Sequence, residues 1–242
     1  MIDFFLRNFN KLALFFGVRL IQDDVATNPA IMLKRLIDRF QVNLFLDVGA
    51  NAGQTSLKLI SSGYKGRILS FEPVPKPYKE LARKAARFSN WKALPVAIGD
   101  FNGFVDVHVA GNLESSSVLP MLERHRQAAP DSAEISQVKA ELRRLDSYLS
   151  DGLIQPEDKI FLKIDVQGFE MQALNGSAGI LNQVVVLQME LSLVPLYEGG
   201  LLFEEIMARL KELGFSLFTI LPGFSDPKTG QLLQMDGVFF KG

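Results

Sequence analysis

A small-residue turn between a predicted strand and a predicted helix is the first feature of this sequence that could do chemistry. An apolar run over residues 44–48 leads into this turn, whose glycines allow a tight bend and a close approach of the following helix. The helix N terminus then presents unpaired backbone N–H groups to a ligand. Such a turn is typical of a parallel α/β sheet that binds a nucleotide-like cofactor. The residues predicted to hold that cofactor are Asp47, Gly49, Ala50, Asn51 and Gly53.

Two acidic residues at the ends of later predicted strands extend this site. Glu72 ends the second strand, where a carboxylate can accept hydrogen bonds from both hydroxyls of a ribose that carries no 2′-phosphate. Asp100 follows the third predicted strand, and in a sheet that begins with strands 3, 2 and 1 in that order this strand end lies beside Glu72. We therefore predict that Glu72 binds a ribose and that Asp100 or its neighbours lie near an adenine edge.

A lysine and two acids near the ends of the fourth and fifth predicted strands are the candidate catalytic residues. Asp165 ends an apolar strand, so partial burial is expected to raise the pKa of its carboxyl toward that of a useful base. Lys163 projects to the same face of the sheet, where it could pair with that carboxylate or orient a substrate oxygen. Glu190, directly after the fifth strand, could bind a substrate hydroxyl. A structural ion pair is the alternative interpretation of Lys163 and Asp165.

A bound divalent cation is another arrangement that these acids allow. Asp165 and Glu190, with or without Glu170, offer the hard oxygen ligands that Mg²⁺ prefers. The positive charge of Lys163 would oppose a cation there, so we favour direct base catalysis and assign no metal site. Glu170 has a further interpretation as a solvated carboxylate at a helix start, favoured by the helix dipole.

Strands and helices alternate along most of the chain, as they do in a parallel α/β sheet. Predicted strands cover residues 44–48, 67–71, 93–98, 159–165 and 184–189, and predicted helices cover 29–40, 54–62, 76–88, 170–175 and 203–213. Two final strands, 215–221 and 237–241, are close enough in sequence to pair as an antiparallel hairpin.

An insertion interrupts this alternation between residues 103 and 139. Residues 103–110 alternate apolar and polar side chains, which predicts an antiparallel strand outside the βα pattern. Insertions at the carboxyl edge of such sheets often cover substrates. The serine run 115–117 could line the substrate opening, although a solvated loop is the alternative. We expect His108 to point outward and His125 to be a solvated helix residue, so neither is a preferred base.

Composition limits the class of protein. The chain has 242 residues, 48% of them hydrophobic, which suits one α/β domain with an appendage. A formal net charge of −1 offers no basic surface to a nucleic acid, so we expect no such partner, and the basic helix 76–88 is interpreted as a solvated face. The absence of cysteine excludes disulfides and thiolate nucleophiles, and two histidines argue against a His-rich metal site.

The first 21 residues form a separate problem, because they are rich in Phe, Leu and Ile. Charged residues interrupt this stretch, so no uninterrupted apolar segment in it is long enough to span a bilayer. Its apolar residues recur at helical spacing, which predicts an amphipathic helix. We expect this helix to pack on the domain or on a second subunit, with contact to a membrane surface as the alternative. The predicted organisation is an N-terminal helical extension over residues 1–42, a single domain over 43–242, and a cytoplasmic location.

Five short motifs occur in an order and spacing that resemble the FkbM-type family of S-adenosylmethionine-dependent methyltransferases. They lie at residues 47–54, 71–73, 96–100, 144–147 and 161–170, and the likeness runs from about residue 43 to the C terminus. Five parallel strand units finished by a two-stranded hairpin likewise resemble the seven-stranded, Rossmann-like sheet of class I methyltransferases. Gln167 departs from the family pattern, which frequently has Glu there, so no role that needs a charge belongs to it.

This resemblance implies S-adenosylmethionine as the cofactor and methylation of a hydroxyl on a small molecule, commonly a sugar or a secondary metabolite. The identity of the acceptor does not carry over. Two other functions are weighed against it: an NAD-dependent oxidoreductase that reads the same glycine turn, and a non-catalytic cofactor-binding scaffold subunit. The glycine spacing and the terminal hairpin count against the oxidoreductase.

Overall fold

The computed structural model describes residues 28–241, and this part of the chain folds around a seven-stranded, mostly parallel sheet. In spatial order the strands are β3 (Trp91–Leu94), β2 (Arg67–Phe71), β1 (Leu44–Val48), β7 (Ile160–Ile164), β8 (Val184–Ser192), β10 (Gln234–Phe240) and β9 (Ser216–Pro222). Only β10 runs antiparallel to its neighbours β8 and β9. The sheet therefore confirms the predicted class I methyltransferase architecture, with its terminal antiparallel hairpin.

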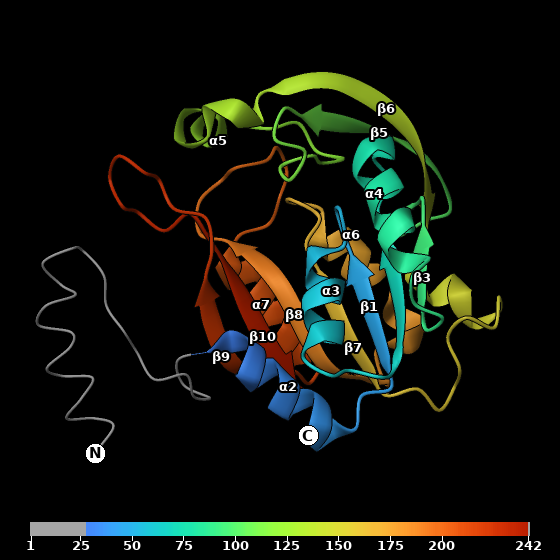
Figure 1. Ribbon diagram of the computed structural model, residues 1–242. Helices are drawn as coiled ribbons and strands as arrows, with labels where there is room; N and C mark the ends of the chain where they lie inside the picture. The colour runs from blue at the N-terminus through green and yellow to red at the C-terminus, as the bar shows by residue number, and fades with distance from the viewer. Residues whose placement is uncertain (1–27, 242) are drawn as a thin grey trace, which may run out of the picture.

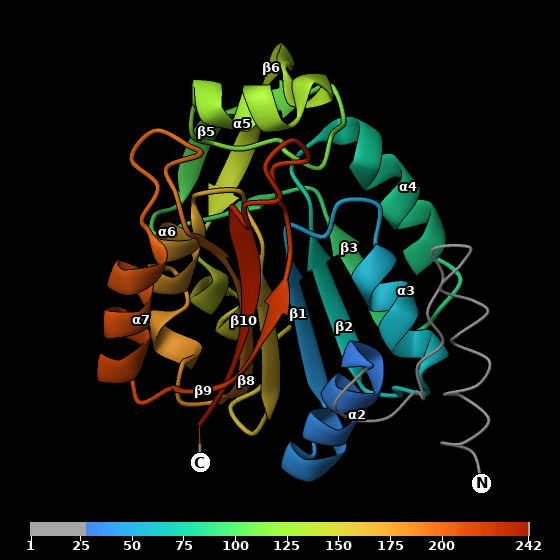
Figure 2. The same ribbon diagram turned by 90° about the vertical axis from the view of Figure 1, so that its left-hand side faces the viewer.

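Helices cover both faces of this sheet (Figures 1 and 2). One face carries α2 (Pro29–Phe40), α3 (Gln54–Ser61) and α4 (Pro75–Ala85), and the other carries α6 (Glu170–Asn175) and α7 (Phe203–Glu212). Every residue of the two central strands β1 and β7 is buried, because each strand has a core on both sides. This double burial explains why both strands are nearly continuous apolar runs in the sequence.

The helix α2 begins and ends where local chemistry predicts. The side chain of Asn28 accepts hydrogen bonds from the backbone N–H groups of Ala30 and Ile31, and Pro29 occupies the first turn. Gln41 ends the helix in the left-handed conformation at φ 52°. The predicted amphipathic helix over residues 1–21 lies outside the described residues, and the division at residue 42 stays a prediction. Within residues 28–241, no helix has the length and apolar character needed to cross a bilayer.

A second, three-stranded sheet with the order β4, β6, β5 lies over the carboxyl ends of the parallel strands (Figures 1 and 2). Its strands are β4 (Ala97–Ile98), β5 (Gly103–Ala110) and β6 (Glu134–Arg143). We call this sheet, together with the segment between β5 and β6 that contains α5 (Glu123–Ala128), the roof. The antiparallel pairing of β5 confirms the predicted excursion. The predicted strand 93–98 is in fact two strands in two sheets, because Pro95 has no N–H to continue a ladder.

Replacing Gly49 with alanine should strongly destabilise the domain. Gly49 has φ +80°, and a Cβ atom at this position would lie 1.8 Å from the backbone oxygen of Asp165. Gly152 is a matched control, because its φ is +69° but nothing lies within 4 Å of the place that its Cβ atom would occupy. We expect Gly152→Ala to cost about 1–2 kcal/mol of unfolding free energy from backbone strain alone, and Gly49→Ala to cost several times more. Urea denaturation measures both; equal costs would contradict the close approach of these two segments.

Candidate functional site

A cavity opens at the carboxyl ends of the parallel strands. Its volume of about 510 Å³ is within the usual range of a small-molecule site. The loop after β1 and the end of β2 form one wall, and the ends of β7 and β8 form another. The roof comes from β5, the following serine-containing loop and α5. Three segments that are far apart in the sequence therefore meet around one space.

The loop after β1 has the backbone geometry that its glycines and Asn51 suggested. Gly49, Asn51 and Gly53 all have positive φ values, and the backbone N–H groups of Gly49 and Ala50 donate to the carbonyl of Phe71 at 3.1 and 3.0 Å. Gly49, Ala50 and Asn51 line the cavity. Gly53 instead packs away from it, where a Cβ would lie within 2.9 Å of Trp91. Gly53 thus shapes the loop without facing the cavity, and Trp91 is a core residue.

Glu72 lies at the end of β2 in the wall of the cavity, with only 6% of its surface exposed. Its Oε2 accepts a hydrogen bond from the N–H of Asn51 at 2.9 Å, and its Oε1 accepts one from the N–H of Val74 at 2.8 Å. Burial raises the pKa of Glu72 to about 7, although both hydrogen bonds oppose that shift. Each carboxylate oxygen keeps one further acceptor position. Glu72 can therefore bind two hydroxyls while it fixes the glycine turn.

Two further predicted cofactor residues lie outside the cavity wall. Asp47 is fully buried beneath the loop, where its Oδ2 accepts a hydrogen bond from Ser56 Oγ at 2.7 Å, and burial raises the pKa of its carboxyl. Asp100 is exposed on the surface, and its backbone oxygen accepts a hydrogen bond from Arg144. The structure therefore does not bring Asp100 to the cavity, because the chain leaves β4 before this residue and turns outward. Val96, Ala97 and Ile98 line the wall in its place.

Lys163 and Asp165 form an ion pair at the end of β7, with Nζ and Oδ2 2.8 Å apart. Lys163 is nearly buried, whereas about a third of the Asp165 side chain is exposed to the cavity, at 31%. Burial favours a raised pKa for Asp165, but the charge and hydrogen bond of Lys163 outweigh it and hold this pKa below its usual range. The prediction of a raised pKa for Asp165 was therefore wrong. Lys163, the nearest cation, determines the direction of the pKa shift of Asp165, and the prediction from burial did not include its charge.

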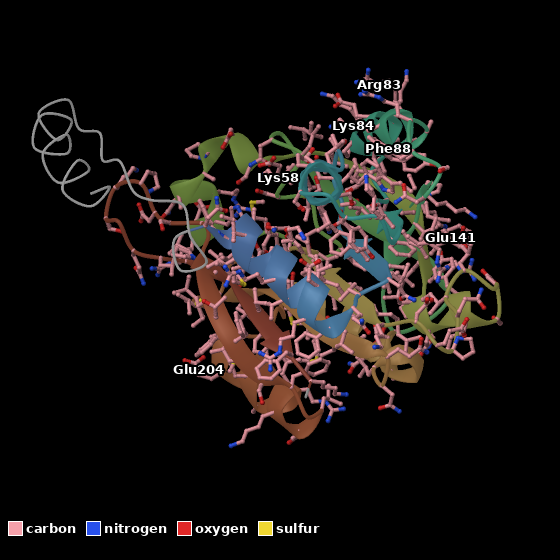
Figure 3. All side chains as sticks on the ribbon, turned by 60° about the horizontal axis from the view of Figure 1, so that its bottom comes forward. Lys58, Arg83, Lys84, Phe88, Glu141 and Glu204 are labelled. Carbon is pink, nitrogen blue, oxygen red and sulfur yellow. The ribbon has the colours of Figure 1, made fainter. Side chains whose placement is uncertain are left out.

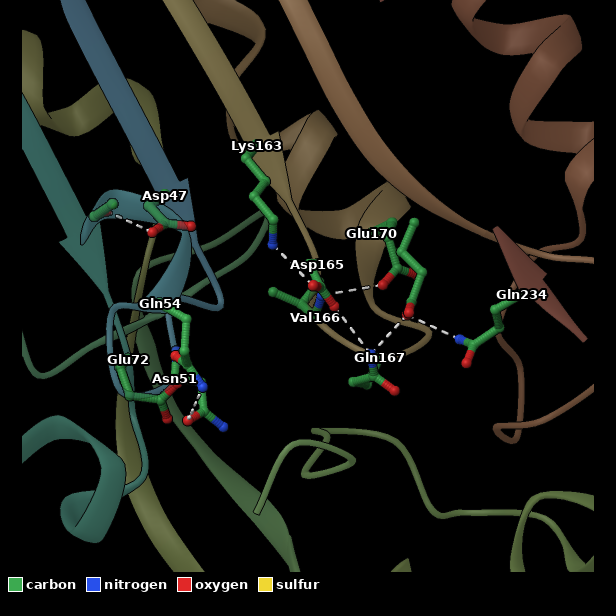
Figure 4. Close-up of polar contacts among 12 residues, drawn as sticks. Asp47, Asn51, Gln54, Glu72, Lys163, Asp165, Val166, Gln167, Glu170 and Gln234 are labelled. Atoms are coloured by element: carbon green, nitrogen blue, oxygen red, sulfur yellow. Dashed lines mark hydrogen bonds and ion pairs between the residues drawn. The ribbon is translucent and has the colours of Figure 1, made fainter. Parts of the chain in front are cut away.

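Gln167 joins this ion pair to the next strand (Figure 4). Its Nε2 donates to Asp165 Oδ1 at 2.9 Å and to Glu190 Oε2 at 2.7 Å. Gln234 also donates to Glu190 Oε2, at 2.8 Å, and the hydroxyl of Tyr197 lies 2.8 Å from Gln167 Oε1. The NH₂ group of an uncharged amide carries two donors, so it can hydrogen-bond two carboxylates at once.

Glu190 lies within β8, which continues to Ser192, and not directly after the strand as predicted. The extension arises because β10 pairs with β8 as far as Ser192 and places Asp236 opposite Glu190. Burial and then the negative charge of Asp165 raise the pKa of Glu190 well above its usual range. Both effects favour the protonated form of Glu190.

Glu170 is buried, with 4% of its surface exposed, so its interpretation as a solvated carboxylate is wrong. Its Oε1 accepts hydrogen bonds from the N–H groups of Val166 and Gly168 at 3.1 and 3.0 Å, and burial raises its pKa to about 7. Glu170 therefore holds the loop after β7. The described residues bring no three His, Asp or Glu side chains together as metal ligands, and the amide of Gln167 lies between Asp165 and Glu190, so magnesium finds no support.

The roof contains the largest departure from the sequence predictions. Ser115, Ser116 and Ser117 line the cavity, in agreement with the predicted substrate opening. His108 bonds the exposed Glu134 with its Nδ1 at 2.8 Å and points outward as expected. The expectation that His125 is solvated is wrong, because this residue is 2% exposed and lines the cavity. No apolar periodicity in the sequence marks the inward face of α5, so only the tertiary fold reveals the burial of His125.

The basic residues of the predicted helix 76–88 lie largely on the surface, as predicted. Lys76, Lys79, Arg83 and Arg87 are exposed, and Figure 3 shows the side chains of Arg83 and Lys84 on the outer side of the molecule. Lys84 differs because its Nζ donates to the backbone oxygen of Ala52 at 2.6 Å and so connects α4 to the loop after β1.

The fold and the cavity together define a class I methyltransferase-type domain. Residues 47–217 match the family model described as the methyltransferase FkbM domain, and the chain belongs to this family. The family confirms the predicted methyltransferase class and supports S-adenosylmethionine as the cofactor.

Two curated relatives share part of this sequence. The chain is 26% identical over 170 residues to the 2-O-methyltransferase NoeI of Sinorhizobium fredii, covering 68% of this chain and 69% of the relative. It is 30% identical over 154 residues to the methyltransferase sdnD of Sordaria araneosa, covering 54% of this chain and 59% of the relative. The chain therefore spans about two thirds or less of the length of these relatives.

Solved structures with a similar arrangement are remote in sequence. One is the 1,6-didemethyltoxoflavin-N1-methyltransferase of Burkholderia thailandensis, with 12% identity and a TM-score of 0.47 over 90% of this chain and 79% of that one. Another is a putative S-adenosylmethionine-dependent methyltransferase of Listeria monocytogenes, with 8% identity and a TM-score of 0.48 over 87% of this chain and 96% of that one.

Replacing Gln167 with glutamate tests the amide link between Asp165 and Glu190. The substitution replaces two donated hydrogen bonds with a third carboxyl among carboxyls, so we expect a loss of about 3 kcal/mol of unfolding free energy at pH 8. The loss should shrink at pH 5, because the cluster can then hold an additional proton. Urea denaturation at both pH values measures it.

Gln231→Glu is the matched control, because Gln231 is exposed and its Oε1 only accepts a hydrogen bond from Arg124. A carboxylate keeps that contact, so little change in stability is expected. Equal effects of the two substitutions would contradict the proposed role of the Gln167 amide.

Proposed function

We propose that this chain is an S-adenosylmethionine-dependent O-methyltransferase that methylates a hydroxyl of a small molecule, such as a sugar or a secondary metabolite. The observation that carries the proposal is that the glycine loop with Glu72 and the polar chain from Lys163 to Glu190 face one cavity. Membership of the FkbM methyltransferase family and the name of the relative NoeI, a 2-O-methyltransferase, support the same reaction.

The cofactor would occupy the side of the cavity formed by β1 and β2. Glu72 would accept hydrogen bonds from the ribose hydroxyls, and the loop from Gly49 to Asn51 would pass close to the remainder of the cofactor. Asp47 acts from beneath, because its hydrogen bond to Ser56 joins the end of β1 to α3 and so positions this loop.

The acceptor hydroxyl would lie near Asp165 and Glu190 at the ends of β7 and β8. The bound cofactor supplies an electrophilic methyl group on a sulfonium, so the protein must align the hydroxyl, exclude water and accept its proton. Asp165 and Glu190 would hold this hydroxyl and take up its proton when it receives the methyl group.

The two carboxyls suit different parts of this task. Lys163 keeps Asp165 ionised, which makes Asp165 a fixed anion that can orient the hydroxyl through a hydrogen bond. The raised pKa of Glu190 makes its ionised form the stronger base. Glu190 is therefore assigned the proton, and Asp165 the alignment of the acceptor.

Binding of S-adenosylhomocysteine, the demethylated product, tests the cofactor site without knowledge of the acceptor. Calorimetry should give a Kd in the micromolar range, about −8 kcal/mol. Glu72→Ala should weaken binding roughly 10- to 100-fold, because a buried carboxylate acceptor for two hydroxyls is lost. Glu80→Ala is the control, since Glu80 is an exposed acid on α4 away from the cavity. Unchanged affinity in Glu72→Ala, or a larger rise in Tm with NAD than with S-adenosylhomocysteine, would overturn the assignment.

The pH dependence of this binding follows from the pKa of about 7 for Glu72. The ionised carboxylate accepts both hydroxyls, whereas the protonated form cannot, so affinity should increase as pH rises through 7. Between pH 6 and pH 8 the Kd should fall roughly tenfold, and Glu72→Gln should abolish this dependence.

Glu190→Gln tests the assignment of the proton. A screen of hydroxylated sugars and natural products with radiolabelled S-adenosylmethionine, with and without a chelator, supplies the acceptor. With the best acceptor, Glu190→Gln should lower kcat by about 10²- to 10⁴-fold, the usual contribution of a general base. The acid limb of the wild-type pH–rate profile, which should lie above the normal carboxyl range, should disappear in this variant. Retention of that limb in Glu190→Gln would assign the proton to another group.

A further inference from the structure

His125 is a buried polar residue in the roof of the cavity that the proposed reaction does not yet use. Its ring packs edge-on against Tyr197 at 5.2 Å and is tilted against Phe224 at 5.1 Å, measured between ring centroids. Among the described residues, its Nδ1 is fully buried and has no hydrogen-bond partner. A buried polar group without a partner costs about 1–3 kcal/mol. Such a cost in a cavity wall indicates a ligand that supplies the missing bond.

The position of His125 relates it to the acceptor and not to the cofactor loop. Tyr197 contacts the imidazole through its ring, and its hydroxyl lies 2.8 Å from Gln167 Oε1. Gln167 in turn binds Asp165 and Glu190. Tyr197 and Gln167 therefore lie between His125 and the carboxyls assigned to the reacting hydroxyl.

We propose that His125 is an acceptor-binding residue, whose unprotonated ring nitrogen accepts a hydrogen bond from a second hydroxyl of the methyl acceptor. This inference rests on the proposed function and deepens it, because it requires an acceptor that carries at least two hydroxyls. One hydroxyl lies at Asp165 and Glu190 and is methylated, and the other lies at His125 and sets the orientation of the molecule.

The surroundings of His125 keep its ring neutral and fixed. Burial lowers the pKa of His125 to about 4, while the negative charge of Asp131 acts in the opposite direction. The ring is therefore uncharged at neutral pH and offers one acceptor nitrogen and one N–H donor. The flanking rings of Tyr197 and Phe224 restrict its rotation, so this acceptor has a defined direction.

Nitrogen-15 NMR of the histidine rings tests this role, because the chain has only two histidines. Protein labelled with ¹⁵N-histidine and saturated with S-adenosylhomocysteine is titrated with 1,2-propanediol, a small neutral diol. The unprotonated ring nitrogen of His125, assigned from the spectrum of His125→Gln, should shift upfield as it accepts a hydrogen bond. His108 is an internal control, because its Nδ1 already binds Glu134. Equal shifts of both histidines, or no shift of His125, would overturn the proposal.

Kinetics with the best acceptor from the screen provides the second readout. His125→Phe keeps the aromatic packing but removes the acceptor nitrogen, so KM for the acceptor should rise about tenfold, equivalent to about 1.4 kcal/mol. The kcat and the Kd for S-adenosylhomocysteine should change little, and His125→Gln, which restores an acceptor oxygen, should recover part of the loss. A Gln variant as impaired as the Phe variant, or a matching loss of S-adenosylhomocysteine binding, would show a merely structural role.

These outcomes separate the inference from the proposed function. A wild-type protein that does not bind S-adenosylhomocysteine would overturn the proposed function itself. A protein that binds it and shows equal shifts of the two histidines would overturn the role of His125 alone.

Discussion

The whole site depends on a backbone contact between the loop after β1 and the end of β7. Gly49 has no side chain, so the carbonyl of Asp165 can lie where a Cβ would otherwise be, and the N–H of Asp165 donates to the backbone oxygen of Val48 at 3.0 Å. This approach brings the loop after β1 and the carboxylate of Asp165 to the same edge of the sheet. Gly49 therefore determines the position of Asp165 as much as it determines the turn, and two motifs far apart in sequence act as one unit.

One buried cation interacts with several acids around this contact. Lys163 lies in register with Asp47 on β1 and bonds Asp165, so its charge attracts acids on both sides. Beyond Asp165 the neutral amides of Gln167 and Gln234 supply donors, and no further cation is needed. Removal of any single partner from such a buried cluster leaves a charge without compensation. The cluster therefore constrains both the stability of the sheet edge and the proton affinity of its acids.

The sequence predicted the elements whose signals are local. The strands β1 and β7 are continuous apolar runs, the helix α2 has its Asn28 cap, and the helix α6 begins at Glu170 as expected. It did not reveal β6, because most of that strand is exposed and its apolar alternation, at Val138, Ala140 and Leu142, is confined to its second half. The pKa direction of Asp165 and the burial of His125 also escaped it. Both depend on neighbours, Lys163 in one case and Tyr197 with Phe224 in the other, whose geometry only the folded chain defines.

The same division separates what family membership can and cannot specify. The proposed cofactor side of the cavity is built mostly from one compact stretch, from β1 to the end of β2, so its motifs are easily recognised in sequence. The proposed acceptor side combines the ends of β7 and β8 with the serine loop and α5 of the roof, which join only in the tertiary structure. A change in the roof could alter the acceptor without disturbing the Gly49–Asp165 contact or the sheet. The proposed acceptor site therefore depends on the insertion between β4 and β6, where His125 lies, as well as on the family motif at residues 161–170, which contains Asp165.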